Sequence, residues 1–312
     1  MPVGAAHTGR AVVVIDAALD WGRRIGGLTV LTRTIAGLAR VGCMVHVHGF
    51  DRLPASQRET ACAELAAMPL APIWQPTDLA AGEHPSVVVT APGLFDPRGL
   101  DLLLGEHLGR DPLAGVNRPN APGRPFLWFV GDATVLDAID LTDQHKATLG
   151  LSAACTGRID PGAVLCDPIA GASDRELEDR LLRTARKATD TWVARTLDRP
   201  ISLALTRRML PHPISPNQIT LVGTSIGLAG AVLLGLGSPR AQLVGALLLT
   251  CSIIVDGCDG EVARLKFLES EFGRKLDFFL DHVVNVTAIF AVGAGYAAHS
   301  GDGRYLLLAT AS

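Results

Sequence analysis

The stretch DGCDGEVARLKFLESEFGRKLDFFLDHV, from Asp256 to Val283, decides the fold and the chemistry expected of this 312-residue chain. Apolar sequence lies on both sides of it, yet it carries the aspartates Asp256, Asp259, Asp277 and Asp281. An unpaired charge is costly in an apolar environment, so acids in such sequence indicate a functional site. The stretch therefore predicts charged chemistry beside a membrane domain.

The spacing of the aspartates predicts two acidic pairs on neighbouring helices. Asp256 and Asp259 are three residues apart and share one helical face, and Asp277 and Asp281 are four apart and share a face of the next helix. We expect Gly273 to break the chain between these helices. Carboxylates that converge repel one another, and Mg²⁺ or Mn²⁺ neutralises them. Two such ions can hold phosphate oxygens and stabilise a displacement at phosphorus.

Three apolar runs surround the aspartates, at 219–236, 241–255 and 278–298. The first and third have the length of a membrane span, and the second has it only if its helix continues into the aspartate stretch. Small residues in the first run suit close helix packing in lipid. We expect a partial α-helical transmembrane domain over 216–312, truncated after its third helix.

The first half of the chain predicts a different domain, in which short apolar runs alternate with helix-like segments. This alternation is typical of an α/β domain with a mostly parallel sheet, which we assign to residues 1–172. The segment 101–125 is rich in Gly, Pro and Arg, and we expect a loop there. The runs are AVVVID at 11–16, MVHVHGF at 44–50, SVVVTA at 86–91 and FLWFVGDA at 126–133.

Residues 173–215 combine many arginines with apolar positions at helical spacing, which predicts amphipathic helices along a membrane surface. Basic residues near the expected spans also predict orientation, because they favour the cytoplasmic side. The α/β domain and the aspartates would then face the cytoplasm in a multi-pass protein of the cell membrane. The residues on that side are Arg207, Arg208, Arg264, Lys266, Arg274 and Lys275, against Arg240 and Arg304 on the other.

Composition excludes several other classes. The net charge of -3 gives no electrostatic case for binding nucleic acid. The six cysteines contain no CxxC pair, so neither a zinc site nor a disulfide framework is indicated.

The aspartate stretch resembles the signature of the CDP-alcohol phosphotransferases, D-x2-D-G-x2-A-R-x8-G-x3-D-x3-D, at all eight fixed positions. The segment ISPNQIT at 214–220 is similar to the family's entry to its first transmembrane helix. Members exchange CMP on a CDP-linked alcohol for a second alcohol within a six-helix membrane domain. The resemblance implies a CDP-alcohol donor, an alcohol acceptor and two ions of Mg²⁺ or Mn²⁺.

The resemblance also implies roles for individual residues. Asp256, Asp259 and Asp277 would be metal ligands. Asp281 would take the proton from the attacking hydroxyl and would also lie near a metal ion. Ion pairing of these acids with Arg264 or Lys275 would explain single charges but not all eight fixed positions. The residues implied around the CDP moiety are Gly260, Ala263, Arg264 and Gly273.

The order of the domains resembles bifunctional proteins that join an inositol-1-phosphate cytidylyltransferase to a di-myo-inositol phosphate phosphate synthase. GGLTVLTRTIAGLARVGC at 26–43 and SVVVTAPGLFDPRGLDLLL at 86–104 are similar to segments of sugar nucleotidyltransferases. Such enzymes open with a glycine-rich loop that cradles the triphosphate, followed by a lysine. This chain reads VIDAALDWGRRIGG there, and Ala91 and Pro92 replace the metal-binding aspartate. We expect a degenerate nucleotidyltransferase-like domain, retained for packing, dimerisation or ligand sensing.

Four functions stay open at this level. The first is a CDP-alcohol phosphotransferase with an inactive front domain, acting on an inositol phosphate or another polar alcohol. The second is a phospholipid synthase that uses CDP-diacylglycerol. The third is a divalent-cation transporter or a scaffold, although these acids cluster at one end of two helices rather than along a path. The fourth keeps an active cytidylyltransferase in front. Contact with membrane lipid is expected, and a homodimer is left open.

Overall fold

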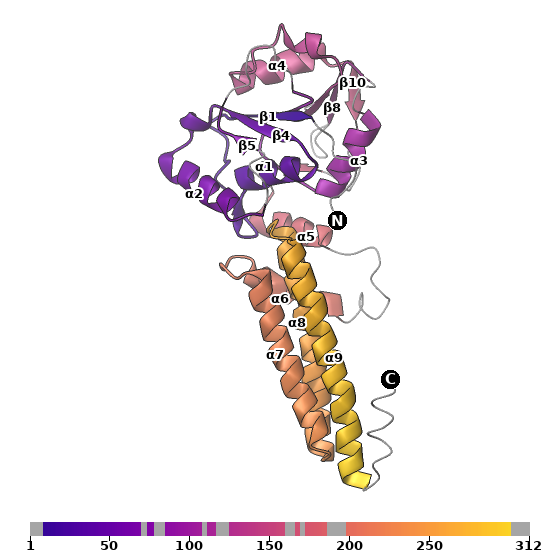
Figure 1. The fold of residues 1–312 in the computed structure, drawn as a ribbon. Coiled ribbons are helices and arrows are strands. Elements are labelled where there is room, and N and C mark those ends of the chain that lie inside the picture. Colours follow the sequence, from indigo (N-terminus) through magenta and orange to yellow (C-terminus); the bar gives the residue numbers. More distant parts are fainter. Residues whose placement is uncertain are drawn as a thin grey trace. The chain divides into compact units, whose positions relative to one another are not determined.

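The computed structural model describes residues 9–69, 74–77, 85–107, 111–116, 125–159, 166–168, 172–185 and 198–300. The chain forms two compact units that divide between Thr184 and Ala185 (Figure 1). This division lies beyond residue 172 because helix α5 (Asp174–Thr184) contacts the first unit. Arg23 fixes the helix there, with its Nη2 2.6 Å from Asp174 Oδ1.

A seven-stranded sheet with the order β10-β8-β9-β6-β1-β4-β5 forms the centre of the first unit. Strand β9 runs antiparallel to both of its neighbours, and every other pair of adjacent strands is parallel. The predicted α/β domain with a mostly parallel sheet is therefore confirmed. The strands are β1 Arg10–Val14, β4 Met44–His48, β5 Trp74–Gln75, β6 Val87–Val89, β8 Leu113–Val116, β9 Leu127–Val130 and β10 Gly157–Ile159.

Helices cover both faces of this sheet, with α1 on one face and α4 on the other (Figure 1). Val12 and Val14 of β1 point to the α4 side, where they join a buried cluster with Trp128 and Leu151. The helices are α1 Val30–Arg40, α2 Ala55–Ala66, α3 Pro97–His107 and α4 Gln144–Ala154, with short 3₁₀ turns at Phe50–Arg52 and Ala133–Leu136. Two small antiparallel pairs complete the described part: β2 Arg24–Ile25 with β3 Leu28–Thr29, and β7 Gly93–Phe95 with β11 Cys166–Pro168.

The predicted loop at 101–125 is wrong, because this segment contains most of α3 and the whole of β8. Leu113 and Val116 of β8 are fully buried between β9 and β10. A strand of four residues is too short to show a period, and the Gly- and Pro-rich sequence around it hides the buried run.

The second unit consists of helices in its described part: α6 Arg199–Met209, α7 Pro216–Gly235, α8 Pro239–Leu265 and α9 Glu271–Ser300. Within the described residues, α7, α8 and α9 have the length and hydropathy of membrane spans. The second apolar run does continue through Asp256 and Asp259, as one helix of 27 residues. The predicted change from an α/β domain to long apolar helices is thereby confirmed.

The break between α8 and α9 lies earlier than predicted. Lys266 ends α8 and Phe267 adopts a left-handed φ of 57°, while the amide of Leu268 donates to Ala263 O. Gly273 is inside the first turn of α9, where its amide donates to Ser270 Oγ at 3.0 Å. The prediction that Gly273 breaks the chain is therefore wrong, because a serine cap starts the helix before it.

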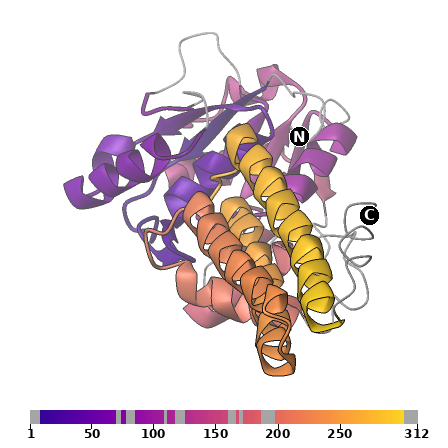
Figure 2. The same cartoon turned by 60° about the horizontal axis from the view of Figure 1, so that its bottom comes forward.

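Helix α7 packs against both α8 and α9 (Figure 2). It begins within ISPNQIT, where Ser215 and Gln218 form a reciprocal capping box. Its backbone touches that of α8 at two glycines. A Cβ atom on Gly245 would lie 2.6 Å from Gly230 O, and one on Gly230 would lie 2.8 Å from Gly245 O. The small residues of the first apolar run therefore permit close helix packing.

Candidate functional site

Three of the four predicted aspartates converge at the end of α8 and the start of α9. One carboxylate oxygen from each of Asp256, Asp259 and Asp277 lies within 4.8 Å of the other two. Asp259 is buried and the other two are half-buried. The tight turn after α8 brings its last turns beside the first turns of α9. Asp256 and Asp259, which are three residues apart on α8, therefore lie close to Asp277 on α9. The local spacing thus predicted a juxtaposition that the structure contains.

Thr220 on α7 holds one of these carboxylates. Its buried hydroxyl donates a hydrogen bond to Asp259 Oδ2. The bond fixes the rotamer of Asp259 relative to α7, as second-shell partners do for metal-binding carboxylates. Sequence reasoning placed Thr220 in the entry motif of the helix and did not assign it this contact.

The cluster suits a divalent cation. Asp277 Oδ1 is buried and has no hydrogen-bond partner among the described residues. A buried acceptor without a donor costs free energy that a bound cation would remove. Carboxylate oxygens from three side chains are the donor set that Mg²⁺ and Mn²⁺ prefer. The residues present therefore fit the implied metal.

Asp281 lies at the edge of this cluster. It is exposed, one helical turn after Asp277 on α9. Its carboxyl group lies near that of Asp256. This position leaves Asp281 accessible to a substrate, while its roles as base and as metal ligand stay predictions.

The residues implied around CDP lie on the same two helices. Gly260 is half-buried on α8, and a Cβ atom there would lie 3.2 Å from Arg264 Nη1, so the guanidinium group lies over this glycine. Ala263 is half-buried one turn further on. A Cβ atom on Gly273 would lie 3.0 Å from Asn217 Oδ1 of α7. Contacts of these residues with a nucleotide stay predictions.

Sequence reasoning missed Glu261, which lies between two fixed positions of the signature. It is fully buried, and both of its carboxylate oxygens accept hydrogen bonds from α6. The sequence did offer a signal, because Glu261 is an acid inside an apolar helix. It was overlooked because the signature allows any residue at this position.

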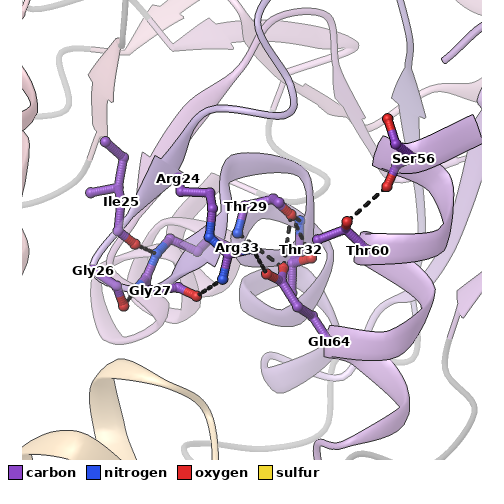
Figure 3. A network of polar contacts seen from close by, with 10 residues as sticks. All are labelled: Arg24, Ile25, Gly26, Gly27, Thr29, Thr32, Arg33, Ser56, Thr60 and Glu64. Carbon is purple, nitrogen blue, oxygen red and sulfur yellow. Dashed lines mark hydrogen bonds and ion pairs between the residues drawn. The ribbon is translucent and has the colours of Figure 1, made fainter. Parts of the chain in front are cut away.

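The first unit has a buried polar network at the N-terminus of α1 (Figure 3). Thr29, the last residue of β3, caps α1, and its amide and hydroxyl both donate to Glu64 Oε2 at 3.0 Å. Glu64 Oε1 forms an ion pair with Arg24 Nη1 at 2.9 Å. A helix N-terminus is an anion site, and here a side chain of α2 supplies the anion.

The side chain of Arg33 binds the backbone of the hairpin formed by β2 and β3 (Figure 3). Its Nε donates to Ile25 O at 2.8 Å and its Nη2 to Gly26 O at 2.9 Å. Gly26 and Gly27 have φ values of 55° and 84°, which suit the turn between β2 and β3. Burial lowers the pKa of Arg33 to about 10, so its guanidinium group is still charged at neutral pH. This buried cation supports the hairpin.

The comparisons with known proteins agree with this geometry. The family model described as CDP-alcohol phosphatidyltransferase matches residues 213–309. A bifunctional IPC transferase and DIPP synthase from Rubrobacter xylanophilus is 32% identical over 225 residues, covering 69% of this chain and 51% of that protein. The protein of the same name from Aquifex aeolicus is 28% identical over 68% of this chain and 50% of its own length.

A third relative represents a different kind of product. A phosphatidylinositol phosphate synthase from Streptomyces avermitilis is 32% identical over 129 residues, which is 39% of this chain and 51% of that protein. The chain spans about half the length of these curated relatives. The two longer alignments cover more of the chain than the family match does, so the similarity extends into residues before 213.

Proposed function

We propose, from the premise that residues 213–309 form a CDP-alcohol phosphatidyltransferase domain, that the second unit transfers a substituted phosphate group from a CDP-alcohol to a second alcohol. The observation that carries this proposal is the convergence of Asp256, Asp259 and Asp277 within 4.8 Å. A transporter or scaffold gives no reason for the signature spacing around these acids.

Asp256, Asp259 and Asp277 would hold divalent ions, with Asp281 at their edge. When bound, Mg²⁺ or Mn²⁺ would neutralise the phosphate oxygens and stabilise the charge that develops on them during displacement. We propose two ions, because four carboxylates lie at this site. Thr220 would keep Asp259 oriented through its hydroxyl. The absence of side chains at Gly260 and Gly273 would let a nucleotide approach the backbone, with the guanidinium group of Arg264 over Gly260.

Asp281 would act as the general base. The oxygen of the acceptor hydroxyl forms a bond to the phosphorus that carries the donor alcohol, and the bond from that phosphorus to CMP breaks. CMP leaves with the electron pair of that bond, and the proton of the hydroxyl passes to Asp281. Its exposure and its place beside Asp256 support this role, because a base must reach both the site and the substrate.

For the acceptor we propose an inositol phosphate. The Rubrobacter and Aquifex proteins, whose names describe IPC transferase and DIPP synthase, support this choice. The Streptomyces phosphatidylinositol phosphate synthase supports the alternative of a lipid product made from CDP-diacylglycerol. Both reactions release CMP and require the same aspartates.

The first unit is proposed to be catalytically degenerate. Glu64 occupies the N-terminus of α1, Arg33 is bound to the hairpin, and Ala91 and Pro92 offer no carboxylate where a metal ligand is expected. Its retained role would be packing, dimerisation or ligand sensing.

We further propose that α7, α8 and α9 span the cell membrane with the first unit on the cytoplasmic side. The lengths and hydropathies of the helices and the distribution of basic residues support this topology. A cysteine placed at Arg240 should react with an impermeant reagent in intact cells, and one at Asp51 should be protected. The opposite pattern would reverse the topology.

The activity is tested with the protein in membranes, Mn²⁺ and a panel of CDP-alcohols that includes CDP-inositol and CDP-diacylglycerol. Release of CMP that requires both Mn²⁺ and an acceptor is the expected result. A preference for CDP-inositol with inositol phosphate identifies the soluble product, and a preference for CDP-diacylglycerol identifies the lipid product. Absence of CMP release with every donor would refute the transferase.

A further inference from the structure

Glu261 is the buried acid of α8 that the metal cluster leaves out. Its side chain is 0% exposed. Arg199 Nη1 and Ser202 Oγ donate to Glu261 Oε1 at 2.7 and 2.8 Å, and Thr206 Oγ1 donates to Oε2 at 2.7 Å. The three donors are spaced by three and four residues, so they lie on one face of α6.

These contacts separate Glu261 from the aspartates in kind. Both of its oxygens are bonded to α6, and Arg199 neutralises its charge. By contrast, Asp277 Oδ1 has no hydrogen-bond partner among the described residues. Glu261 is therefore placed to hold a helix, and the aspartates are placed to hold an ion.

Apolar packing surrounds this polar contact. Cys258 and Val262 of α8 form a buried cluster with Ile219 of α7, against which Leu205 and Met209 of α6 pack. Gly257 of α8 faces α6, since a Cβ atom there would be in van der Waals contact with Ser202 Cβ at 3.7 Å. Helices α6, α7 and α8 thus share one core, and the charged side chain of Glu261 is buried beside it.

The position of Glu261 determines what the contact controls. Successive residues of an α-helix turn by about 100°, so Asp259 and Glu261 leave α8 on sides about 160° apart. Thr220 of α7 holds Asp259 on one side, and α6 holds Glu261 on the other. Hydrogen bonds on nearly opposite sides within one turn fix the rotation of α8 about its axis, and that rotation aims Asp256 and Asp259 at α9.

We propose that Glu261 is a positioning residue, which joins α6 to the signature helix and sets the geometry of the metal ligands. This rests on the proposed function of the aspartates. A buried ion pair is a poor means of adding stability, because apolar residues of the same volume often stabilise a fold as well or better. Its directional bonds instead specify one orientation of the two helices.

The test uses the full chain and Mn²⁺ alone as the probe. Bound Mn²⁺ raises the unfolding temperature, and the Mn²⁺ concentration at half of the maximal rise measures apparent affinity. We expect Glu261→Gln to raise this midpoint by about 10-fold, the lower end of the effect of losing an outer-shell partner, because Glu261 acts on the ligands through α8 and does not touch them. The Mn²⁺ concentration for half-maximal CMP release should rise by the same factor.

Leu205→Ala is the matched control, because it weakens the same helix contact without touching Glu261. It should lower the unfolding temperature without Mn²⁺ and leave the midpoint unchanged. Equal shifts of the midpoint in both variants, or none in Glu261→Gln, would overturn the proposal in favour of a merely structural role.

If Glu261→Gln fails to fold, Thr206→Val decides the question. It removes one donor at nearly constant shape and leaves the pair with Arg199, so a smaller rise of the midpoint is expected. An unchanged midpoint in this variant would overturn the proposal. A wild-type protein that shows no response to Mn²⁺ would instead refute the proposed function of the aspartates.

Discussion

At the N-terminus of α1 the carboxylate of Glu64 lies against Thr29 and a cation, Arg24, whereas at the turn between α8 and α9 carboxylates converge on one another. Glu64 accepts two hydrogen bonds from Thr29 and pairs with Arg24. The aspartate cluster leaves Asp277 Oδ1 buried without a donor from the described residues. The difference distinguishes a carboxylate that completes a fold from one that awaits a ligand.

The first unit therefore uses one carboxylate to satisfy donors at a helix N-terminus, and the second places several carboxylates where we propose that a cation binds. In the first unit, the carboxylate of Glu64 interacts favourably with the dipole at the N-terminus of α1, so no anion from outside the protein is needed there. In the second, repulsion among the aspartates makes the metal-free site costly, and a cation offsets that cost.

The largest effect is expected at the aspartate cluster. Replacing Asp256, Asp259 or Asp277 with Ala should abolish CMP release together with the response of the unfolding temperature to Mn²⁺. The metal-free protein should be no less stable than the wild type, because one charge of a repelling group has been removed. A variant that keeps wild-type turnover and Mn²⁺ affinity would exclude that residue from the site.

Asp281→Asn sharpens the contrast within the second unit. The variant keeps the shape and one acceptor oxygen but loses most of the basicity. We expect the rate of CMP release to fall by about 10²- to 10⁴-fold, with affinity for the CDP-alcohol nearly unchanged. The comparison is made with Asp256→Asn. Equal loss of donor binding in both variants would show that Asp281 acts chiefly as a metal ligand.

Glu64→Ala tests the first unit. It leaves the amide and hydroxyl of Thr29 without their acceptor, so the free energy of unfolding should fall by about 1–3 kcal/mol. Urea denaturation followed through the fluorescence of buried Trp21 and Trp128 measures the change. Glu59→Ala, at an exposed position of the same helix, is the control. Equal stability of the two variants would show that the Glu64 contacts contribute little.

The smallest effect is expected for the reaction of the protein with CTP. With its anion site filled by Glu64, the chain should form no CDP-inositol from CTP and inositol phosphate. The product is followed by chromatography of the nucleotides, with an active cytidylyltransferase as the positive control. Formation of CDP-inositol by this chain would refute a degenerate first unit and restore the bifunctional alternative.

The parts of the site that could be predicted are those fixed by local spacing. Residues three or four apart on a helix share a face whatever the rest of the chain does, so Asp256 and Asp259 could be paired from sequence. The apolar runs likewise predicted the long helices. Short elements such as β8 gave no usable period, and the cap at Ser270 overrode the expected break at Gly273.

Contacts between distant segments could not be predicted in this way. Glu261 is 62 residues from Arg199, and Glu64 is 35 residues from Thr29. No spacing rule pairs residues so far apart, because their meeting depends on how whole helices pack. The same limit concealed Thr220, whose partner Asp259 belongs to another helix.

The glycine contact between α7 and α8 has a consequence for how this sequence can change over generations. Gly230 and Gly245 each lie against the carbonyl oxygen of the other, so neither can gain a side chain unless the helices separate. Both lie on the helices that carry Thr220 and Asp259, several turns away from them. Neither glycine touches the site, yet a mutation at either would reach it through the helix axes. The two positions should therefore remain small together in descendants of this chain that keep its chemistry.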